Sequence, residues 1–66
     1  MSRERLQEAV GLLRSYAAQH GPFHSFWELA EDVEGFLNGR PTVLFLGEQE
    51  WLVYLERRFE EVRIKF

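Results

Sequence analysis

Cysteine is absent from this chain of 66 residues, and proline occurs only twice. Without cysteine, neither a disulfide bond nor a thiolate zinc site can stabilise the fold. Domains below about 70–80 residues usually gain only about 3–5 kcal/mol from their own core, and many depend on a crosslink or a partner. We therefore expect the protein to associate with itself, as a homodimer, or with another protein. The lack of cysteine also fits a cytoplasmic location.

Long hydrophobic runs and an excess of positive charge are missing as well. No segment approaches the roughly 18–20 apolar residues that span a bilayer, and the N-terminus has no apolar signal-peptide core. The formal net charge is −3 and the isoelectric point is about 5.3, which opposes attraction to phosphates. These absences argue against a membrane and against nucleic acid as partners.

What is present is typical of a globular protein, with 45% hydrophobic and 29% charged residues. The length suits one compact domain covering residues 1–66. Aromatic residues make up 15% of the chain. Because a domain of this size buries only about 60% of its unfolded surface, we expect some of these rings to lie outside the core.

Two amphipathic helices are predicted in the N-terminal half. Residues 2–20 carry apolar side chains at three- and four-residue steps, and Gly21-Pro22 follows as a stop signal. Ser25-Phe26-Trp27-Glu28 has the pattern of a capping box, in which Ser25 caps a second helix that ends at Asn38-Gly39. Residues 21–50 contain six acidic residues and one basic residue, so this part of the chain is acidic.

A small sheet is predicted after these helices. Thr42–Leu46 is a continuous β-prone run, which is typical of a buried strand. In Val62–Phe66, apolar and charged residues alternate with the period of a half-exposed strand. This second strand is expected at an edge of the sheet, where it could pair with another chain.

Residues 48–60 fit either a helix or a strand. Trp51, Leu55 and Phe59 share one helical face, with acids in the first turn and arginines in the last. A hairpin would make this segment a strand, but it needs a reversal within residues 57–61, which contain no Gly, Pro, Asn or Asp. The helix is favoured. The predicted fold is therefore α+β, two helices followed by a small sheet (α-α-β-α-β), and the alternative is a three-stranded meander after the helices (α-α-β-β-β).

No pattern of residues indicates catalysis or cofactor binding. His20 and His24 are four residues apart, but Gly21-Pro22 separates them, so the metal-ligand spacing of a helix does not apply. The serines lie in no nucleophile motif, and the chain has no phosphate-binding loop with its lysine. We expect no enzyme, no cofactor, no metal site and no small-molecule substrate.

The hypothesis that remains is a non-catalytic protein-interaction module. Large aromatic residues at the fringe of a helix stripe are enriched among interface anchors, and an edge strand can pair across a two-fold axis. On these grounds the candidate contacts are Tyr16, Trp27, Tyr54, Val62, Ile64 and Phe66.

The alternative hypothesis is a nucleic-acid-associated regulatory protein. Four basic residues gather near the C-terminus, interleaved with glutamates: Arg57, Arg58, Arg63 and Lys65. Contacts of lysine and arginine with phosphate supply most of the non-specific affinity for nucleic acid. The overall negative charge weakens this alternative.

Overall fold

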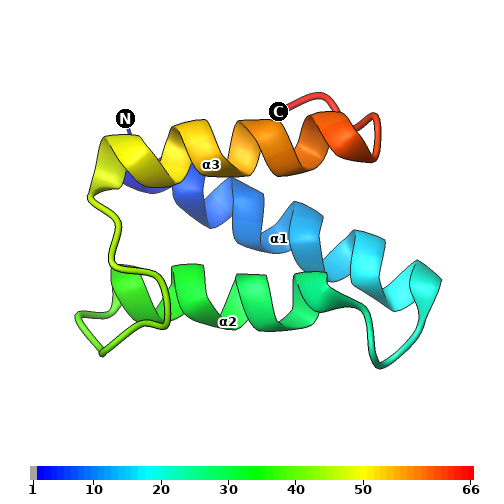
Figure 1. Cartoon of the computed structure of the whole chain (residues 1–66), viewed down its shortest axis with the longest axis horizontal. Coiled ribbons are helices and arrows are strands. Elements are labelled where there is room, and N and C mark those ends of the chain that lie inside the picture. Colours follow the sequence, from blue (N-terminus) through cyan, green and yellow to red (C-terminus); the bar gives the residue numbers. More distant parts are fainter. Residues whose placement is uncertain (1) are drawn as a thin grey trace.

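The structure is a computed structural model that describes residues 2–66. It consists of three helices (Figure 1). They are α1 (Ser2–His20), α2 (Ser25–Leu37) and α3 (Glu48–Glu61). No strand forms anywhere in residues 2–66, so the predicted α+β fold is wrong and this part of the chain is all-helical. The meander alternative is wrong for the same reason.

The helices themselves agree with the sequence pattern. The first has the predicted bounds, and α2 ends before Asn38 and Gly39, where Gly39 adopts a left-handed φ of 72°. The third covers the segment for which a helix was favoured over a hairpin, and that prediction is confirmed. At its start, Glu50 Oε1 accepts a hydrogen bond of 3.0 Å from the Gly47 amide.

The start of α2 differs from the predicted capping box. Its N-cap is His24, whose Nδ1 accepts a hydrogen bond of 3.1 Å from the Phe26 amide. Ser25 is the first helical residue, and its hydroxyl accepts from Arg58 at 3.4 Å instead. An imidazole nitrogen can replace a serine hydroxyl at the cap, because either one satisfies an amide that has no partner inside the helix.

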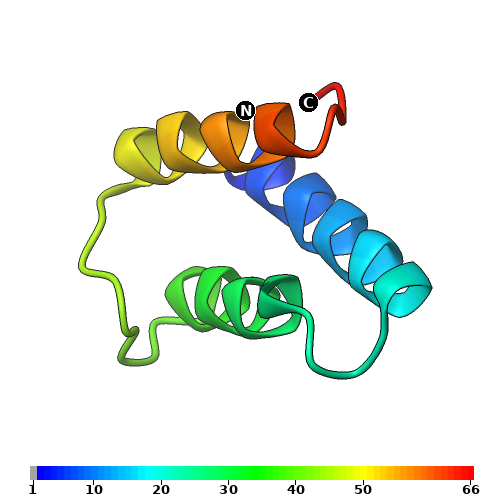
Figure 2. The same ribbon diagram turned by 45° about the vertical axis from the view of Figure 1, so that its right-hand side comes forward.

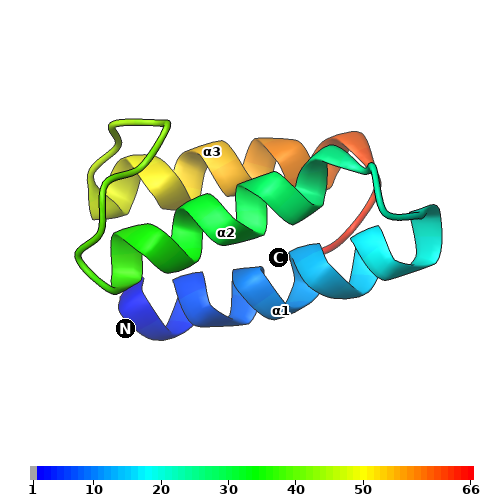
Figure 3. The same cartoon turned by 90° about the horizontal axis from the view of Figure 1, so that it is seen from below.

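The first helix is the element on which the other two pack. As Figures 1 and 2 show, α2 and α3 run antiparallel to each other on the same side of α1. Figure 3 shows α1 lying along α2, with which its packing is more extensive. All three helices contribute to one apolar core, whose largest fully enclosed side chains are Leu6, Leu13, Phe26, Val33, Trp51, Leu55 and Phe59.

Two pairs of aromatic rings span the space between α2 and α3. Phe26 and Phe59 meet near one end, with ring centroids 6.1 Å apart and planes at 84°. Phe36 and Trp51 meet near the other end, with centroids 6.2 Å apart. Between these rings, α2 contributes smaller side chains to the core, namely Leu29, Ala30 and Val33. Both α2 and α3 pack on α1 more than on each other.

The segment between α2 and α3 is a loop, not the predicted strand Thr42–Leu46. It has the alternation of a strand, because Leu44 packs against the core while Val43 and Phe45 are 84% and 90% exposed. No second strand lies beside it in residues 2–66, and the amides of Val43 and Leu44 donate to the carboxylate of Asp32. A side chain of α2 thus satisfies backbone groups that a sheet would otherwise satisfy.

Val62–Phe66 is likewise not a strand, and it forms the turn that ends α3. The Ile64 amide donates to the Phe59 carbonyl at 2.9 Å, and Arg63 has a left-handed φ of 61° that closes the turn. Apolar and charged residues alternate in this segment because it folds back over the core, with residues 62, 64 and 66 turned inward. There the centre of the Phe66 ring lies 5.1 Å from that of the Phe59 ring. No sheet edge is present in the described part of the chain, so dimerisation by strand pairing has no basis there.

Some aromatic rings do lie outside the core, as expected, but they are not the ones proposed as contacts. Phe23, in the turn after α1, is 98% exposed, and Phe45 is 90% exposed. Trp27 and Tyr54 are half-buried. Surplus apolar surface therefore concentrates in the connecting segments rather than at the fringe of the helices.

Arg63 gives a direct test of the turn that replaces the second strand. It is the one non-glycine residue with a positive φ among residues 2–66, and such a conformation costs about 1–2 kcal/mol in a residue with a Cβ atom. We expect Arg63→Gly to raise the free energy of unfolding by about 1 kcal/mol in urea denaturation. Lys65→Gly is the control, because Lys65 is exposed without a positive φ and its replacement should not stabilise. A lower stability of Arg63→Gly would contradict the turn.

An ion pair joins α1 to α2 outside the core. Arg14 Nη1 and Nη2 donate to the two carboxylate oxygens of Glu34 at 3.1 and 3.0 Å. These hydrogen bonds and the positive charge of Arg14 hold the pKa of Glu34 below its usual value of 4.5. The ionised form of Glu34 is therefore favoured by folding.

Stability should depend on pH through this pair. Because the pKa of Glu34 is lower in the folded state than in the unfolded state, the ion pair contributes its full stability at pH values above the unfolded-state pKa. This contribution is lost as the pH falls through the folded-state pKa. Glu34→Gln should therefore lower the free energy of unfolding at neutral pH, and the difference should disappear at strongly acidic pH. Urea denaturation at both pH values measures it. Glu8→Gln, on the exposed side of α1, should show no such difference, and a penalty for Glu34→Gln that persists in acid would rule out an ionic origin.

Candidate interaction surface

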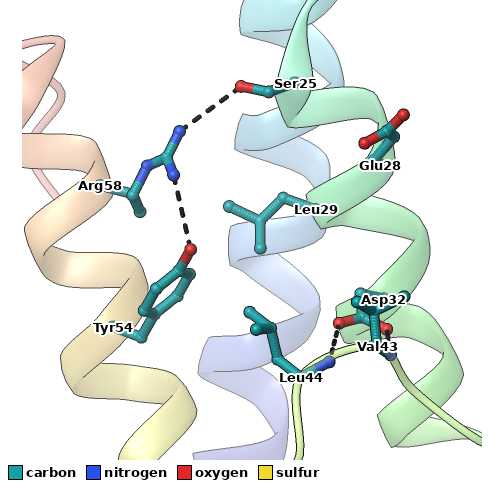
Figure 4. A pocket seen from close by; sticks show the side chains of 8 residues that line it. All are labelled: Ser25, Glu28, Leu29, Asp32, Val43, Leu44, Tyr54 and Arg58. Carbon is teal, nitrogen blue, oxygen red and sulfur yellow. Dashed lines mark hydrogen bonds between the residues drawn. The ribbon is translucent and has the colours of Figure 1, made fainter.

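A pocket of about 260 Å³ opens between α2 and α3 (Figure 4). Both helices and the loop that joins them contribute to its walls. We call it the α2–α3 pocket, and its lining residues are Ser25, Glu28, Leu29, Asp32, Val43, Leu44, Tyr54 and Arg58.

The α2 side of the pocket is one face of a regular helix. Asp32 lies four residues after Glu28 and three after Leu29, so it neighbours both on the helix surface, and the three side chains fall within about 100° of the helix circumference. Leu29 is only 8% exposed and belongs to the core, which makes it the apolar floor. Figure 4 shows these residues opposite Tyr54 and Arg58 of α3.

Asp32 fixes the loop that closes one end of the pocket. Its Oδ1 accepts from the Val43 amide at 2.7 Å, and its Oδ2 accepts from the Leu44 amide at 3.0 Å. The Thr42 hydroxyl adds a bond of 2.7 Å to the Leu44 carbonyl. These bonds turn Leu44 toward the core and leave Val43 exposed at the edge of the pocket.

Arg58 forms the opposite wall, where four neighbours hold its guanidinium. Nη1 donates to the Tyr54 hydroxyl and Nη2 donates to the Ser25 hydroxyl, both at 3.4 Å (Figure 4). Nε lies 3.1 Å from Glu61 Oε1, and the guanidinium carbon lies 5.5 Å from the centre of the Phe26 ring. The positive charge of Arg58 is therefore balanced by Glu61.

The pocket carries a negative charge on balance. Arg58 is paired with Glu61, and both remaining charged residues of the lining, Glu28 and Asp32, are acidic. Glu28 is exposed and forms no ion pair with another residue of the described chain. Its carboxylate is thus free to meet a positive charge from outside.

A second hollow of about 430 Å³ adjoins the α2–α3 pocket, and Tyr54 lines both. Its other lining residues are Leu46, Gln49, Glu50, Val53 and Arg57. Val53 is 55% exposed, and Phe45 lies in the chain between the lining residues of the two hollows. We call Val43, Phe45 and Val53 the apolar rim, since they are the large apolar side chains left exposed in this region.

The residues predicted as contacts are dispersed by the fold. Tyr16 stacks on His20 with ring centroids 4.1 Å apart, and Trp27 Nε1 donates to the Gly21 carbonyl at 3.0 Å, so both use their rings within the domain. Only Tyr54 lies at the α2–α3 pocket.

The three candidates in the C-terminal turn are Val62, Ile64 and Phe66. All are half-buried and pack against the core, and the guanidinium carbon of Arg5 lies 4.4 Å from the centre of the Phe66 ring. None of them lines either hollow. They are therefore separate from the surface described here.

The basic residues predicted as nucleic-acid contacts do not form one free cluster. Arg57 lines the second hollow, and Arg58 is held by Tyr54, Ser25 and Glu61. Arg63 and Lys65 are exposed in the turn after α3. No observation favours phosphate binding by this group over its present contacts.

Sequence reasoning misses the apolar rim because it assigns Val43 and Phe45 to a buried strand. The available signal was Pro41 and Gly47 at the two ends of the run, which favour a loop as readily as a strand boundary. The sequence gives no signal that singles out Val53, which lies outside the face that Trp51, Leu55 and Phe59 bury.

Neither a metal site nor a related protein identifies the function. In residues 2–66, no three His, Cys, Asp or Glu side chains gather to hold a metal ion, and His24 uses its Nδ1 as the cap of α2. No helix of the described chain is long and apolar enough to cross a membrane. Comparison with family models, curated proteins and solved structures finds no match for this chain.

The role of Asp32 in shaping the pocket can be tested by amide hydrogen exchange. Hydrogen bonds to a charged acceptor contribute about 1.5–3 kcal/mol, so Asp32→Ala should speed exchange at Val43 and Leu44 by about tenfold or more. Measurement by NMR resolves the two amides. Glu31→Ala, one position earlier on α2, should leave them unchanged, and equal exchange in wild type and Asp32→Ala would mean that the loop is held in another way.

Proposed function

We propose that this domain is a non-catalytic protein-interaction module that binds a segment of another protein on the α2–α3 pocket and the apolar rim. The observation that carries the proposal is the exposure of Val43 and Phe45, at 84% and 90%, beside a pocket with an apolar floor. Exposed apolar side chains next to a pocket are typical of a protein contact surface. The absence of cysteine supports a cytoplasmic site of action.

The exposed position of the apolar side chains favours a protein segment over a small molecule. Small-molecule sites bury most of the ligand. Here Val43 and Phe45 are 84% and 90% exposed, so much of the apolar surface lies outside the α2–α3 pocket. A protein segment would use both, by inserting a side chain into the pocket and covering Val43 and Phe45.

The same surface is small for a homodimer. A standard interface buries about 800 Å² on each partner, whereas an aromatic side chain covers only about 150–250 Å². The apolar rim consists of one phenylalanine and two valines, so its area suits a short segment better than a folded copy of the domain. Strand pairing, one of the two grounds on which a homodimer was expected, is also missing from residues 2–66.

Selection from a displayed library of random peptides tests the proposal. Peptides selected on the wild-type domain should bind Val43→Ser/Phe45→Ser at least about tenfold more weakly, measured by fluorescence anisotropy, because the double variant removes the apolar contacts. Both side chains are exposed, so the stability should change by no more than about 0.5 kcal/mol.

Phe23→Ser is the matched control for this experiment. Phe23 is 98% exposed and apolar but lies in the turn after α1, whereas Phe45 stands in the loop between the lining residues Leu44 and Leu46. Its replacement should leave peptide binding intact. Failure to select any peptide, or equal losses in Phe23→Ser and the double variant, would overturn the proposal.

A further inference from the structure

The wall of the α2–α3 pocket that lies on α2 bears charge where a contact surface usually has none. Glu28 and Asp32 flank Leu29 on one helical face, within two turns of α2. Core positions of protein contact surfaces are depleted in charged residues unless the partner supplies the opposite charge. Both oxygens of Asp32 are engaged by the amides of Val43 and Leu44, so it is the unpaired carboxylate of Glu28 that carries information about the occupant beyond its apolar character.

We infer that the occupant is a basic amphipathic segment, whose apolar residues cover the rim and whose lysine or arginine side chain enters the pocket. This inference rests on the proposed function and specifies the partner. The aliphatic part of such a side chain would lie on Leu29 and Leu44, and its positive end would reach Glu28. The apolar floor thus matches the aliphatic part of a lysine or arginine side chain, and the free carboxylate of Glu28 matches its charged end.

Arg58 does not oppose a positive occupant, although it lines the same pocket. Its Nε is 3.1 Å from Glu61, and its two terminal nitrogens are turned toward Tyr54 and Ser25. An acidic segment would have to displace these contacts and would also meet Glu28 and Asp32. Charge complementarity thus selects a basic occupant over an acidic one.

A helix suits an amphipathic occupant, because its apolar residues recur at three- and four-residue steps along one face. Such a face can contact the exposed apolar side chains while a neighbouring position presents the basic residue to Glu28.

The experiment uses two fluorescein-labelled peptides of about four helical turns, alike in their leucine positions and different in their charged positions. One carries lysine at these positions and the other carries glutamate. With the whole domain, the lysine peptide should bind at least about tenfold more tightly than the glutamate peptide at low salt, and its affinity should fall as salt is added. Fluorescence anisotropy measures both.

Glu28→Gln should weaken binding of the lysine peptide by about three- to tenfold, because it removes the free carboxylate and keeps the shape of the side chain. Glu8→Gln changes the net charge equally on α1, away from the pocket, and should leave the affinity within about twofold. Equal loss in both variants would overturn the inference, since only net charge would then matter.

The inference and the proposed function fail in different ways. If both peptides bind equally and both are lost in Val43→Ser/Phe45→Ser, the interaction surface is correct and the basic occupant is wrong. The inference is also wrong if neither peptide binds and sedimentation shows a concentration-dependent dimer that the same double variant abolishes. The occupant would then be a second copy of this chain. Tighter binding of the glutamate peptide would overturn the inference directly.

Discussion

The contact of two aromatic pairs across α2 and α3 is the constraint on which the rest of the structure depends. Phe26 with Phe59 and Phe36 with Trp51 place four large rings between helices that also pack on α1. Trp51, Phe26 and Phe59 are almost completely buried and are the three largest of the fully buried side chains. The two ring contacts lie near opposite ends of α2 and α3, and the α2–α3 pocket opens between the same two helices, with Leu29 in its lining.

The loop between α2 and α3 follows from the same constraint. It connects the end of α2 to the start of α3, and Asp32 fixes it to α2 through the amides of Val43 and Leu44. Once those amides are satisfied, Leu44 faces the core and Val43 and Phe45 face outward. The proposed contact surface is therefore a consequence of how the core is built, since the residues that hold the loop also shape the pocket.

Prediction from the sequence succeeded where a pattern reports on local structure. The three helices follow from apolar periodicity and stop signals, such as Gly39 after α2, and these depend only on neighbouring residues. It fails for Val62–Phe66, where the alternation predicts a strand but the segment forms a turn. Alternate burial also arises when a turn folds an extended segment over a core, as Arg63 and Phe66 show here.

The sequence by itself determined the bounds of α1, the end of α2 and the face of α3 that Trp51, Leu55 and Phe59 bury. These are set by the spacing of apolar side chains within each segment. The tertiary structure decided that no sheet forms in residues 2–66 and that Glu28, Asp32, Tyr54 and Arg58 line one pocket. A strand exists only if another segment pairs with it, and a pocket exists only where residues distant in the chain meet, so neither can be read from local spacing.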